Sequence, residues 1–270
     1  MEISSTFAAS DGNEYEIQMG RWSRRLAEPF LDFTGTANDE AVLDVGCGTG
    51  NLAFAIAQRA KVKSIKGVDF SPAYVENARH RNRASEITFD VGDATALPYG
   101  DGSFDRVLSM LVLFFVPNAK KAVSEMKRVA RPGGTAGACL WDARGGMITN
   151  RMFADTAAVL DPRGHELRAR AFTRPLGHPG DLGRAWREAG FRDVKEATLI
   201  IRMEFANFED FWRPYMGGQG PYAEYVSKLT SDEQATLKHH LQRAYLDGEP
   251  DGRRSYVAVA VADAVKGTNP

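Results

Sequence analysis

At 270 residues, 43% of them hydrophobic and 26% charged, the chain can bury a substantial core, which we expect to form one domain with an insertion. With 34 Lys and Arg against 35 Asp and Glu, its formal net charge of −1 leaves no positive excess for binding nucleic acid. Two cysteines are too few for a disulfide framework, and no apolar run approaches the roughly 20 residues that cross a bilayer, so we expect a cytoplasmic protein without a membrane partner.

The N-terminal part of the chain predicts helices before any sheet. Residues 1–14 are small, polar and without period, as in a lead-in segment. From Tyr15 to Phe33 apolar residues recur at roughly helical spacing, with Gly20 and Pro29 as interruptions. This pattern predicts one or two short helices.

The stretch VLDVGCGTG, from Val42 to Gly50, is a short apolar run that ends in three glycines at alternate positions. Glycine tolerates positive φ and lets another molecule approach the backbone closely, so we expect a buried strand whose carboxyl end holds a ligand. Residues 51–60 then have helical period. The spacing G-x-G-x-G differs from the dinucleotide fingerprint G-x-G-x-x-G, which argues against NAD.

Two further predicted strands each end in an acidic residue. The strand over 64–69 ends at Asp69, 19 positions after Gly50, where Rossmann-like folds place an acid that accepts hydrogen bonds from ribose hydroxyls. Asp69 could instead cap the next helix, although Ser71 already has the preferred capping position before Pro72. A third strand over 87–93 alternates in polarity and ends at Asp93.

The remaining elements complete an alternating pattern. A fourth strand covers 106–110, an apolar run continues to Val116, a helix covers 118–130, and the sequence RPGG precedes a fifth strand over 135–141. Residues 142–171 contain helical pieces that we interpret as an insertion over the ligand edge of the sheet. A helix over 181–189, a strand over 194–205, a helix over 231–247 capped by Ser231, and a strand over 255–265 follow.

These motifs, in this order, resemble class I S-adenosylmethionine-dependent methyltransferases of the type found in ubiquinone and menaquinone biosynthesis. DVGCGTG (44–50) is similar to their first motif, MGRWSR (19–24) to a helix that folds over the cofactor, and GDA (92–94) to an adenine-recognition turn. LPYGDGSFD (97–105) and RVARPGG (128–134) resemble the segments before the fourth and fifth strands. The resemblance covers about residues 15–142.

The resemblance implies a Rossmann-like α/β fold: a seven-stranded, mostly parallel sheet with its last strand pair antiparallel, helices on both faces and a helical cap. We expect an N-terminal helical segment over the cofactor (1–36), a core (37–142, 181–206 and 255–270) and a cap or acceptor region (143–180 and 207–254). The cofactor would be S-adenosyl-L-methionine, with S-adenosyl-L-homocysteine as product.

The resemblance also implies a set of cofactor-binding residues. The glycine turn would hold the methionine end, and a carboxylate at Asp93 suits the exocyclic amine of adenine, unless Asp93 only caps the short segment 94–97. Arg21 could meet the cofactor carboxylate in a charge-assisted pair or lie solvated on a helix surface. The expected cofactor-binding residues are Asp44, Gly46, Cys47, Gly48, Gly50, Asp69, Phe70, Asp93, Ala94, Met110, Leu111 and Arg21.

The acceptor is expected to be a small molecule held by aromatic residues. Seven aromatic residues fall between Phe205 and Tyr225, and they either line an acceptor pocket or form the core of the cap. Many relatives carry a histidine where this chain has Leu113-Phe114-Phe115, which argues against a catalytic base from that loop. The expected acceptor contacts are Trp22, Phe114, Phe115, Trp212 and Tyr215.

No catalytic residue is predicted, because methyl transfer from a sulfonium mainly requires alignment and exclusion of water. His165, His178, Tyr215 and Tyr222 are available as bases, but no spacing singles one out, and no Cys/His cluster indicates a metal. Two alternatives of other classes stay open: an NAD-dependent oxidoreductase, and a non-catalytic module that binds a nucleoside cofactor.

Overall fold

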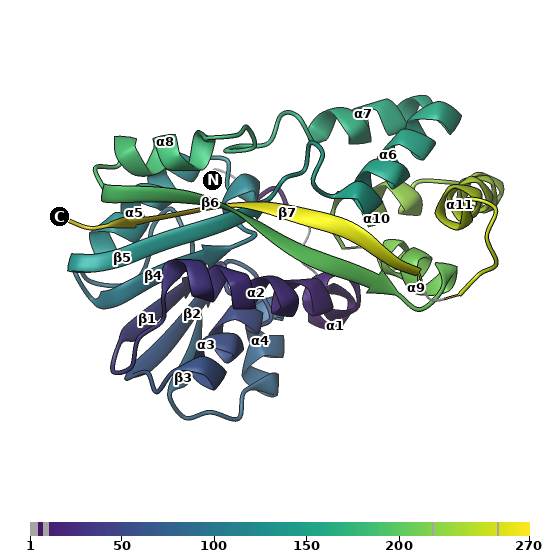
Figure 1. The fold of residues 1–270 in the computed structure, drawn as a ribbon. Coiled ribbons are helices and arrows are strands. Elements are labelled where there is room, and N and C mark those ends of the chain that lie inside the picture. The colour runs from purple at the N-terminus through teal and green to yellow at the C-terminus, as the bar shows by residue number, and fades with distance from the viewer. Residues whose placement is uncertain (1–4, 8–10, 218, 253) are drawn as a thin grey trace.

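The computed structural model describes residues 5–7, 11–217, 219–252 and 254–270, the last range without the side chains of 254–261. The chain forms a central sheet with helices on both of its faces and a group of further helices at one end (Figure 1). Among the described helices, none has both the length and the apolar character that a membrane span requires.

The N-terminal segment is one nearly continuous helical run rather than two separate helices. It comprises α1 (Gly12–Tyr15), a π-helical turn η1 (Glu16–Gly20) and α2 (Arg21–Thr34). Neither predicted interruption ends it: Gly20 closes the π-helical turn, and Pro29 lies inside α2. Burial holds α2 together despite the hydrogen bond that proline removes, since Leu26, Phe30 and Leu31 are fully buried.

The sheet has seven strands in the order β3-β2-β1-β4-β5-β7-β6. The pairs from β3 to β5 are parallel, and only β7 runs antiparallel to its two neighbours, which confirms the predicted fold class. The strand order reverses between β1 and β4, the position at which open α/β sheets bind ligands. The strands are β1 (Ala41–Val45), β2 (Ser64–Asp69), β3 (Ile87–Val91), β4 (Phe104–Met110), β5 (Ala130–Trp141), β6 (Arg192–Phe205) and β7 (Arg254–Thr268).

Four connecting helices complete the layers. The helices α3 (Asn51–Arg59) and α4 (Pro72–Arg81) share a face of the sheet with α2, whereas α5 (Ala119–Val129) and α8 (Asp181–Glu188) cover the other face (Figure 1). Ser71 caps α4 as predicted, because its hydroxyl accepts from the Tyr74 amide. The strand β5 begins five residues earlier than we expected, since residues 130–134 join it through an irregular register.

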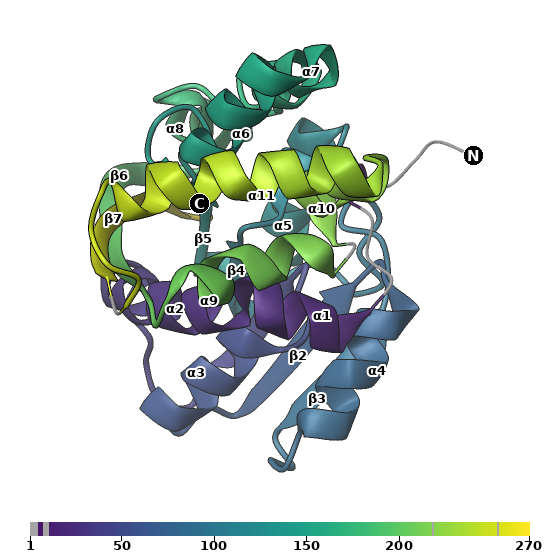
Figure 2. The same cartoon turned by 90° about the vertical axis from the view of Figure 1, so that its right-hand side faces the viewer.

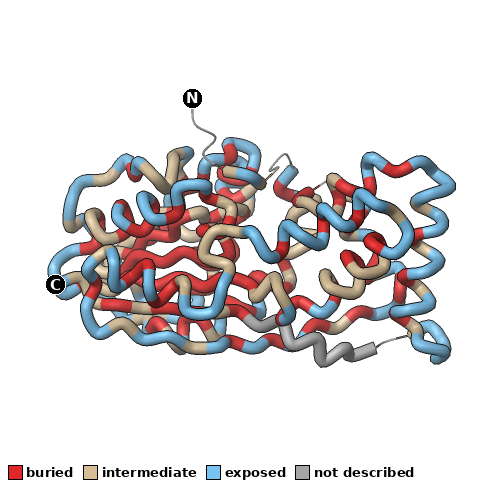
Figure 3. The backbone as a smooth tube through the Cα atoms, turned by 90° about the horizontal axis from the view of Figure 1, so that it is seen from above, coloured by how far each residue is buried: buried red, intermediate tan, exposed pale blue. Residues whose placement is uncertain are grey.

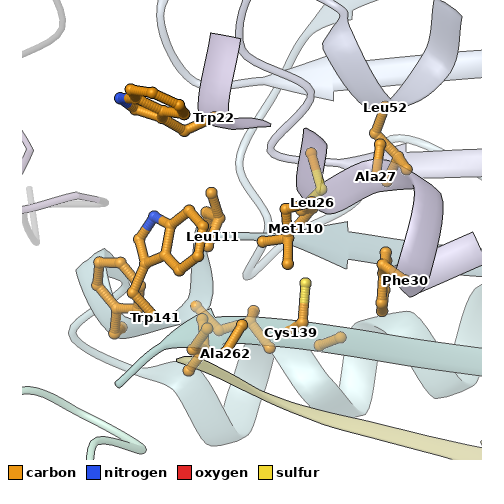
Figure 4. Packing of buried hydrophobic residues seen from close by; sticks show 14 of the residues in the cluster. Trp22, Leu26, Ala27, Phe30, Leu52, Met110, Leu111, Cys139, Trp141 and Ala262 are labelled. Atoms are coloured by element: carbon orange, nitrogen blue, oxygen red, sulfur yellow. The ribbon is translucent and has the colours of Figure 1, made fainter. Parts of the chain in front are cut away.

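The core lies between the sheet and its two helical layers. Buried residues follow the strands, while the helices alternate between buried and exposed positions (Figure 3). Leu26 and Phe30 of α2 lie beside Met110 and Cys139 from the adjacent strands β4 and β5 (Figure 4). This packing fixes α2 across the middle of the sheet.

The further helices gather at one end of the molecule, where Figure 2 shows several of them facing the viewer. Contacts between aromatic rings join these helices. The ring centroid of Phe153 lies 4.4 Å from that of Tyr215 and 5.4 Å from that of Tyr222, and the centroids of Phe208 and Tyr245 are 5.6 Å apart. The helices are α6 (Ile148–Leu160), α7 (Pro162–Arg170), α9 (Phe208–Trp212), η3 (Arg213–Met216), α10 (Gly220–Ser227) and α11 (Ser231–Leu246).

Thr230, rather than the predicted Ser231, caps α11. The Thr230 hydroxyl accepts from the Glu233 amide at 3.3 Å, and the Glu233 carboxylate accepts from the Thr230 amide at 2.7 Å. This reciprocal pair is a capping box, which satisfies two amides that the helix itself leaves unpaired.

We therefore expect Thr230→Ala to lower the free energy of unfolding by about 1 kcal/mol, the typical cost of losing an N-cap. Ser231→Ala is the matched control and should change it by less than about 0.5 kcal/mol, as for an ordinary surface substitution. Denaturant unfolding of both variants measures the difference. An equal loss in the two variants would contradict this assignment of the cap.

Candidate active site

One cavity lies at the carboxyl ends of β1, β2 and β4, below the N-terminal segment. It lies beside the group of further helices described above, which we call the cap helices. It brings together strand ends, the glycine turn and aromatic residues that are distant in sequence. Of the predicted residues, those that line it are Asp44, Gly46, Cys47, Gly48, Asp69, Phe70, Asp93, Ala94, Met110, Leu111, Trp22, Phe114, Phe115 and Tyr215.

The glycine turn requires glycine at each of its three positions. Gly46, Gly48 and Gly50 have φ of 74°, 53° and 88°, in the left-handed region that other residues rarely adopt. A Cβ at Gly46 would come within 2.3 Å of the Val112 side chain. Gly50 does not line the cavity: it precedes α3, and a Cβ there would meet the ring of Phe54 at 2.8 Å.

Asp69 joins the end of β2 to the glycine turn. One carboxylate oxygen accepts from the Gly48 amide and the other from the Ser71 amide, both at 2.9 Å. The side chain is buried, and this burial raises its pKa despite the two hydrogen bonds, which lower it. Each oxygen retains a further lone pair, so the carboxylate can still accept hydrogen bonds from a ligand.

Asp44 is a second buried acid in the same cavity. It is 1% exposed, and its Oδ2 atom has no hydrogen-bond partner among the described residues. Burial, with a further contribution from the negative charge of Asp69, raises the pKa of Asp44 to about 8. An unpaired buried carboxylate oxygen costs free energy, and a cationic or hydrogen-bond-donating ligand would remove that cost.

Residues around Asp93 line a further part of the cavity. Asp93 accepts from both the amide and the hydroxyl of Thr95, at 2.7 and 2.8 Å through the same oxygen, so the capping role considered from sequence is present. Its other oxygen makes no bond in this turn. Phe70 is 37% exposed where it borders the cavity, which leaves its ring accessible to a planar ligand.

Glu16, which the sequence motifs did not single out, fastens the N-terminal segment to the glycine turn. Its carboxylate accepts from Thr49 at 2.5 Å and Asn51 at 2.6 Å, and forms ion pairs with Arg24 and Arg81 at 2.6 and 2.8 Å. Burial opposes its ionisation, but the hydrogen bonds and the charge of Arg81 outweigh it and lower the Glu16 pKa. Tyr15 and Met19, on either side, line the cavity.

Arg21 does not lie in the cavity, where the resemblance implied that it would contact the cofactor carboxylate. Its guanidinium pairs with Asp210 at 2.9 Å, and its central carbon lies 4.3 and 4.9 Å from the ring centroids of Trp22 and Phe205. It does not line the cavity. The aromatic face and the Asp210 carboxylate hold this charge between α2 and α9, so its position is explained by packing of the cap.

The segment after β4 forms one wall of the cavity. Leu111 has a φ of 67°, a left-handed conformation unusual for leucine, and its amide donates to the Cys139 carbonyl at 2.8 Å. A short 3₁₀ turn, η2 (Leu113–Phe115), follows. It presents Phe114 and Phe115 to the cavity.

The predicted acceptor residues divide into two groups. Trp22 and Tyr215 line the cavity, as does Tyr222. Trp212 does not, because it is buried against Phe208, with ring centroids 6.4 Å apart. Trp212 is therefore a core residue of the cap.

The two candidate histidines also lie outside the cavity. His165 is exposed, and the exposed His178 lies with Nδ1 2.8 Å from a nitrogen of Arg144. Within the described ranges, no group of three or more His, Cys, Asp or Glu side chains is arranged to hold a metal ion. Arg174, which sequence patterns did not indicate, does line the cavity.

Comparison with known proteins shows that the central part of the chain is similar to methyltransferases. A methyltransferase domain family model matches residues 43–137. The chain is 36% identical over 114 residues to methyltransferase GfsG of Streptomyces halstedii, a match that covers 41% of each protein. It is 35% identical over 116 residues to demethylmenaquinone methyltransferase of Thermus thermophilus, covering 42% of this chain and 51% of that protein. The matches thus span about half or less of these curated relatives.

The fold extends beyond the matched segment. The structure of phosphoethanolamine N-methyltransferase 2 of Haemonchus contortus, solved with S-adenosyl-L-methionine, is similar with a TM-score of 0.60 and 16% identity. That likeness covers 96% of this chain and 56% of the other. Residues 43–137 therefore match the methyltransferase domain family, and the chain has the fold of the solved methyltransferase structure.

Proposed function

We propose that the protein is an S-adenosylmethionine-dependent methyltransferase that acts on a small molecule. The observation that carries the proposal is the placement of two buried acids, Asp44 and Asp69, at one glycine turn. The unpaired Asp44 oxygen fits the ammonium of the methionine end of the cofactor, and Asp69 fits the ribose hydroxyls. The curated relatives and the family model support the same activity.

The other cavity residues supply the remaining contacts of the cofactor. The free oxygen of Asp93 and the amide of Ala94 suit the edge of adenine, and Phe70 suits its face. When bound, the cofactor supplies a methyl group that is already activated on a sulfonium. The chain then has to position the acceptor and exclude water, which the aromatic walls of the cavity do.

A tyrosine base is not part of the proposal. Burial raises the pKa of Tyr222 to about 12 and that of Tyr215 further above its ordinary value. Both phenols are therefore protonated at neutral pH, so they can donate a hydrogen bond to the acceptor but do not remove its proton. Acceptors whose nucleophilic atom already has a lone pair, or is already ionised, fit this site best.

We also propose a division of labour along the chain, with the segment 1–36 and the core 37–142 holding the cofactor. The cap, 143–180 and 207–254, would select the acceptor through Tyr215 and Tyr222. The remaining core segments complete the sheet. A cytoplasmic location stays a prediction from the low cysteine count.

The proposal is tested by two measurements. Calorimetry should show that S-adenosyl-L-homocysteine binds and that NAD does not, which removes the oxidoreductase alternative. Incubation with methyl-labelled S-adenosylmethionine and a metabolite extract, followed by mass spectrometry, should yield a labelled small molecule. Tight binding without any labelled product would favour the non-catalytic module instead.

We expect Asp69→Ala to weaken S-adenosyl-L-homocysteine binding by on the order of 10- to 100-fold, since hydrogen bonds to a charged group contribute about 1.5–3 kcal/mol. The control is Asp90→Ala, because Asp90 bonds to Tyr99 and does not line the cavity. Calorimetry gives the dissociation constants, and thermal unfolding checks the fold. An unchanged constant in a folded Asp69→Ala protein would refute the ribose assignment.

Binding of the cofactor product should release a proton near pH 7. With a pKa of about 8, Asp44 is mostly protonated at that pH in the free protein, whereas a bound ammonium stabilises its ionised form and lowers the pKa. The release should therefore approach about one proton per site at pH 7 and decline above pH 8. Calorimetry in buffers of different ionisation enthalpy measures it.

The matched variant for this measurement is Asp44→Asn, which has the same shape and cannot ionise. It should bind S-adenosyl-L-homocysteine without releasing a proton at pH 7. Wild-type binding with no proton release would show that Asp44 does not meet a cation.

A further inference from the structure

Arg174 brings a positive charge to the cavity from the segment between α7 and α8. Its guanidinium carbon lies 4.9 Å from the ring centroid of Phe114 and 5.2 Å from that of Phe115. Cation–π contacts of this kind favour one position for a side chain that is otherwise long and flexible. Arg174 and both rings line the same cavity.

This charge has no acidic partner within the described part of the chain. Within these described residues the Arg174 guanidinium forms no ion pair or side-chain hydrogen bond, whereas the neighbouring Arg170 pairs with Glu224 at 3.5 Å. Asp155, an acid that influences the pKa of Tyr222, already pairs with Arg151 and Arg168. Partial burial lowers the Arg174 pKa; Tyr222 opposes this shift, and the charge of Arg170 adds a smaller lowering effect.

Arg174 is half-buried, and a guanidinium that is partly removed from water without an acidic partner is costly in an unliganded protein. It has five N–H donors in a planar fork, which matches the oxygens of a carboxylate or a phosphate. At this site those donors face a cavity whose nearby walls are aromatic rather than acidic. A ligand anion would supply both the missing charge and the missing acceptors.

The position of Arg174 favours the acceptor over the cofactor. The cavity acids Asp44 and Asp69 lie on β1 and β2, where we place the cofactor, whereas Arg174 lies between α7 and α8 and contacts the rings of Phe114 and Phe115. The ionisable side chains that influence the Arg174 pKa are Tyr222 and Arg170, which lie on α10 and α7 of the cap. Arg174 therefore belongs electrostatically to the cap side of the cavity.

We propose that the methyl acceptor is an anion, a small molecule with a carboxylate or phosphate group, and that Arg174 binds this group while the aromatic wall holds the apolar part. This inference rests on the proposed function. It adds a substrate class that neither the glycine turn nor the family motifs indicate, since Arg174 lies beyond the matched segment 43–137.

The test uses matched pairs of small probes on protein saturated with S-adenosyl-L-homocysteine. Benzoate is compared with benzamide, and phenyl phosphate with phenol, by calorimetry or ligand-observed NMR. Benzamide has nearly the shape of benzoate without its charge, and phenol is phenyl phosphate without the charged group. We expect at least one charged probe to bind on the order of 10- to 100-fold more tightly than its neutral partner, as charge-assisted hydrogen bonds allow.

Arg174→Gln should remove this preference for the charged probe, and Arg174→Lys should keep part of it. Arg170→Gln is the control: it removes an arginine four residues away that has its own acidic partner, and the preference should persist. S-adenosyl-L-homocysteine affinity should stay within about threefold in all three variants. The benzoate and phenyl phosphate results decide between a carboxylate and a phosphate.

Three results would overturn the inference. Equal binding of charged and neutral probes to the wild-type protein is the first, and it needs no variant to fold. A preference that survives in Arg174→Gln is the second. A loss of S-adenosyl-L-homocysteine affinity in Arg174→Gln equal to the loss of probe preference is the third, since it would assign Arg174 to the cofactor carboxylate. Failure of the wild-type protein to bind S-adenosyl-L-homocysteine would count instead against the proposed function.

Discussion

The hydrogen bonds from the amides of Gly48 and Ser71 to Asp69 are the constraint on which the site depends. They connect the turn after β1 to the end of β2, so two neighbouring strands end at a fixed distance from each other. The glycines allow the turn to bend toward Asp69, because all three have positive φ. The turn and the two strand ends therefore form a cavity floor that is joined by hydrogen bonds.

The cavity concentrates groups that reduce the stability of the free protein. Asp44 is buried with an unpaired oxygen near Asp69, and Arg174 is held among aromatic rings without a counter-ion in the described chain. Neither Asp44 nor Arg174 can therefore be explained as a member of a structural ion pair. Perturbed ionisable groups that gather in one cavity are typical of functional sites.

The sequence was sufficient for features that depend on neighbouring residues and insufficient for those that depend on distant partners. Strand periodicity, the glycine turn and the Ser71 cap are local, and the structure has each of them, although β5 begins five residues early and Thr230 rather than Ser231 caps α11. Arg21 has its partner at Asp210, and Trp212 packs against the cap rather than into the cavity. No periodicity indicates such pairings, because tertiary packing decides which side of a helix faces the ligand. The same holds for Glu16, whose partners lie at Thr49, Asn51 and Arg81.

The attachment of the N-terminal segment at Glu16 also separates two levels of stability. Residues 11–20 contribute no strand to the sheet, and side-chain bonds from Glu16 and Asn13 join them to the core. Breaking those bonds exposes one wall of the cavity and leaves the strand ladder intact. We therefore expect this segment to open on its own, so its amides should exchange with solvent by local opening while those of β1 and β4 exchange only on global unfolding.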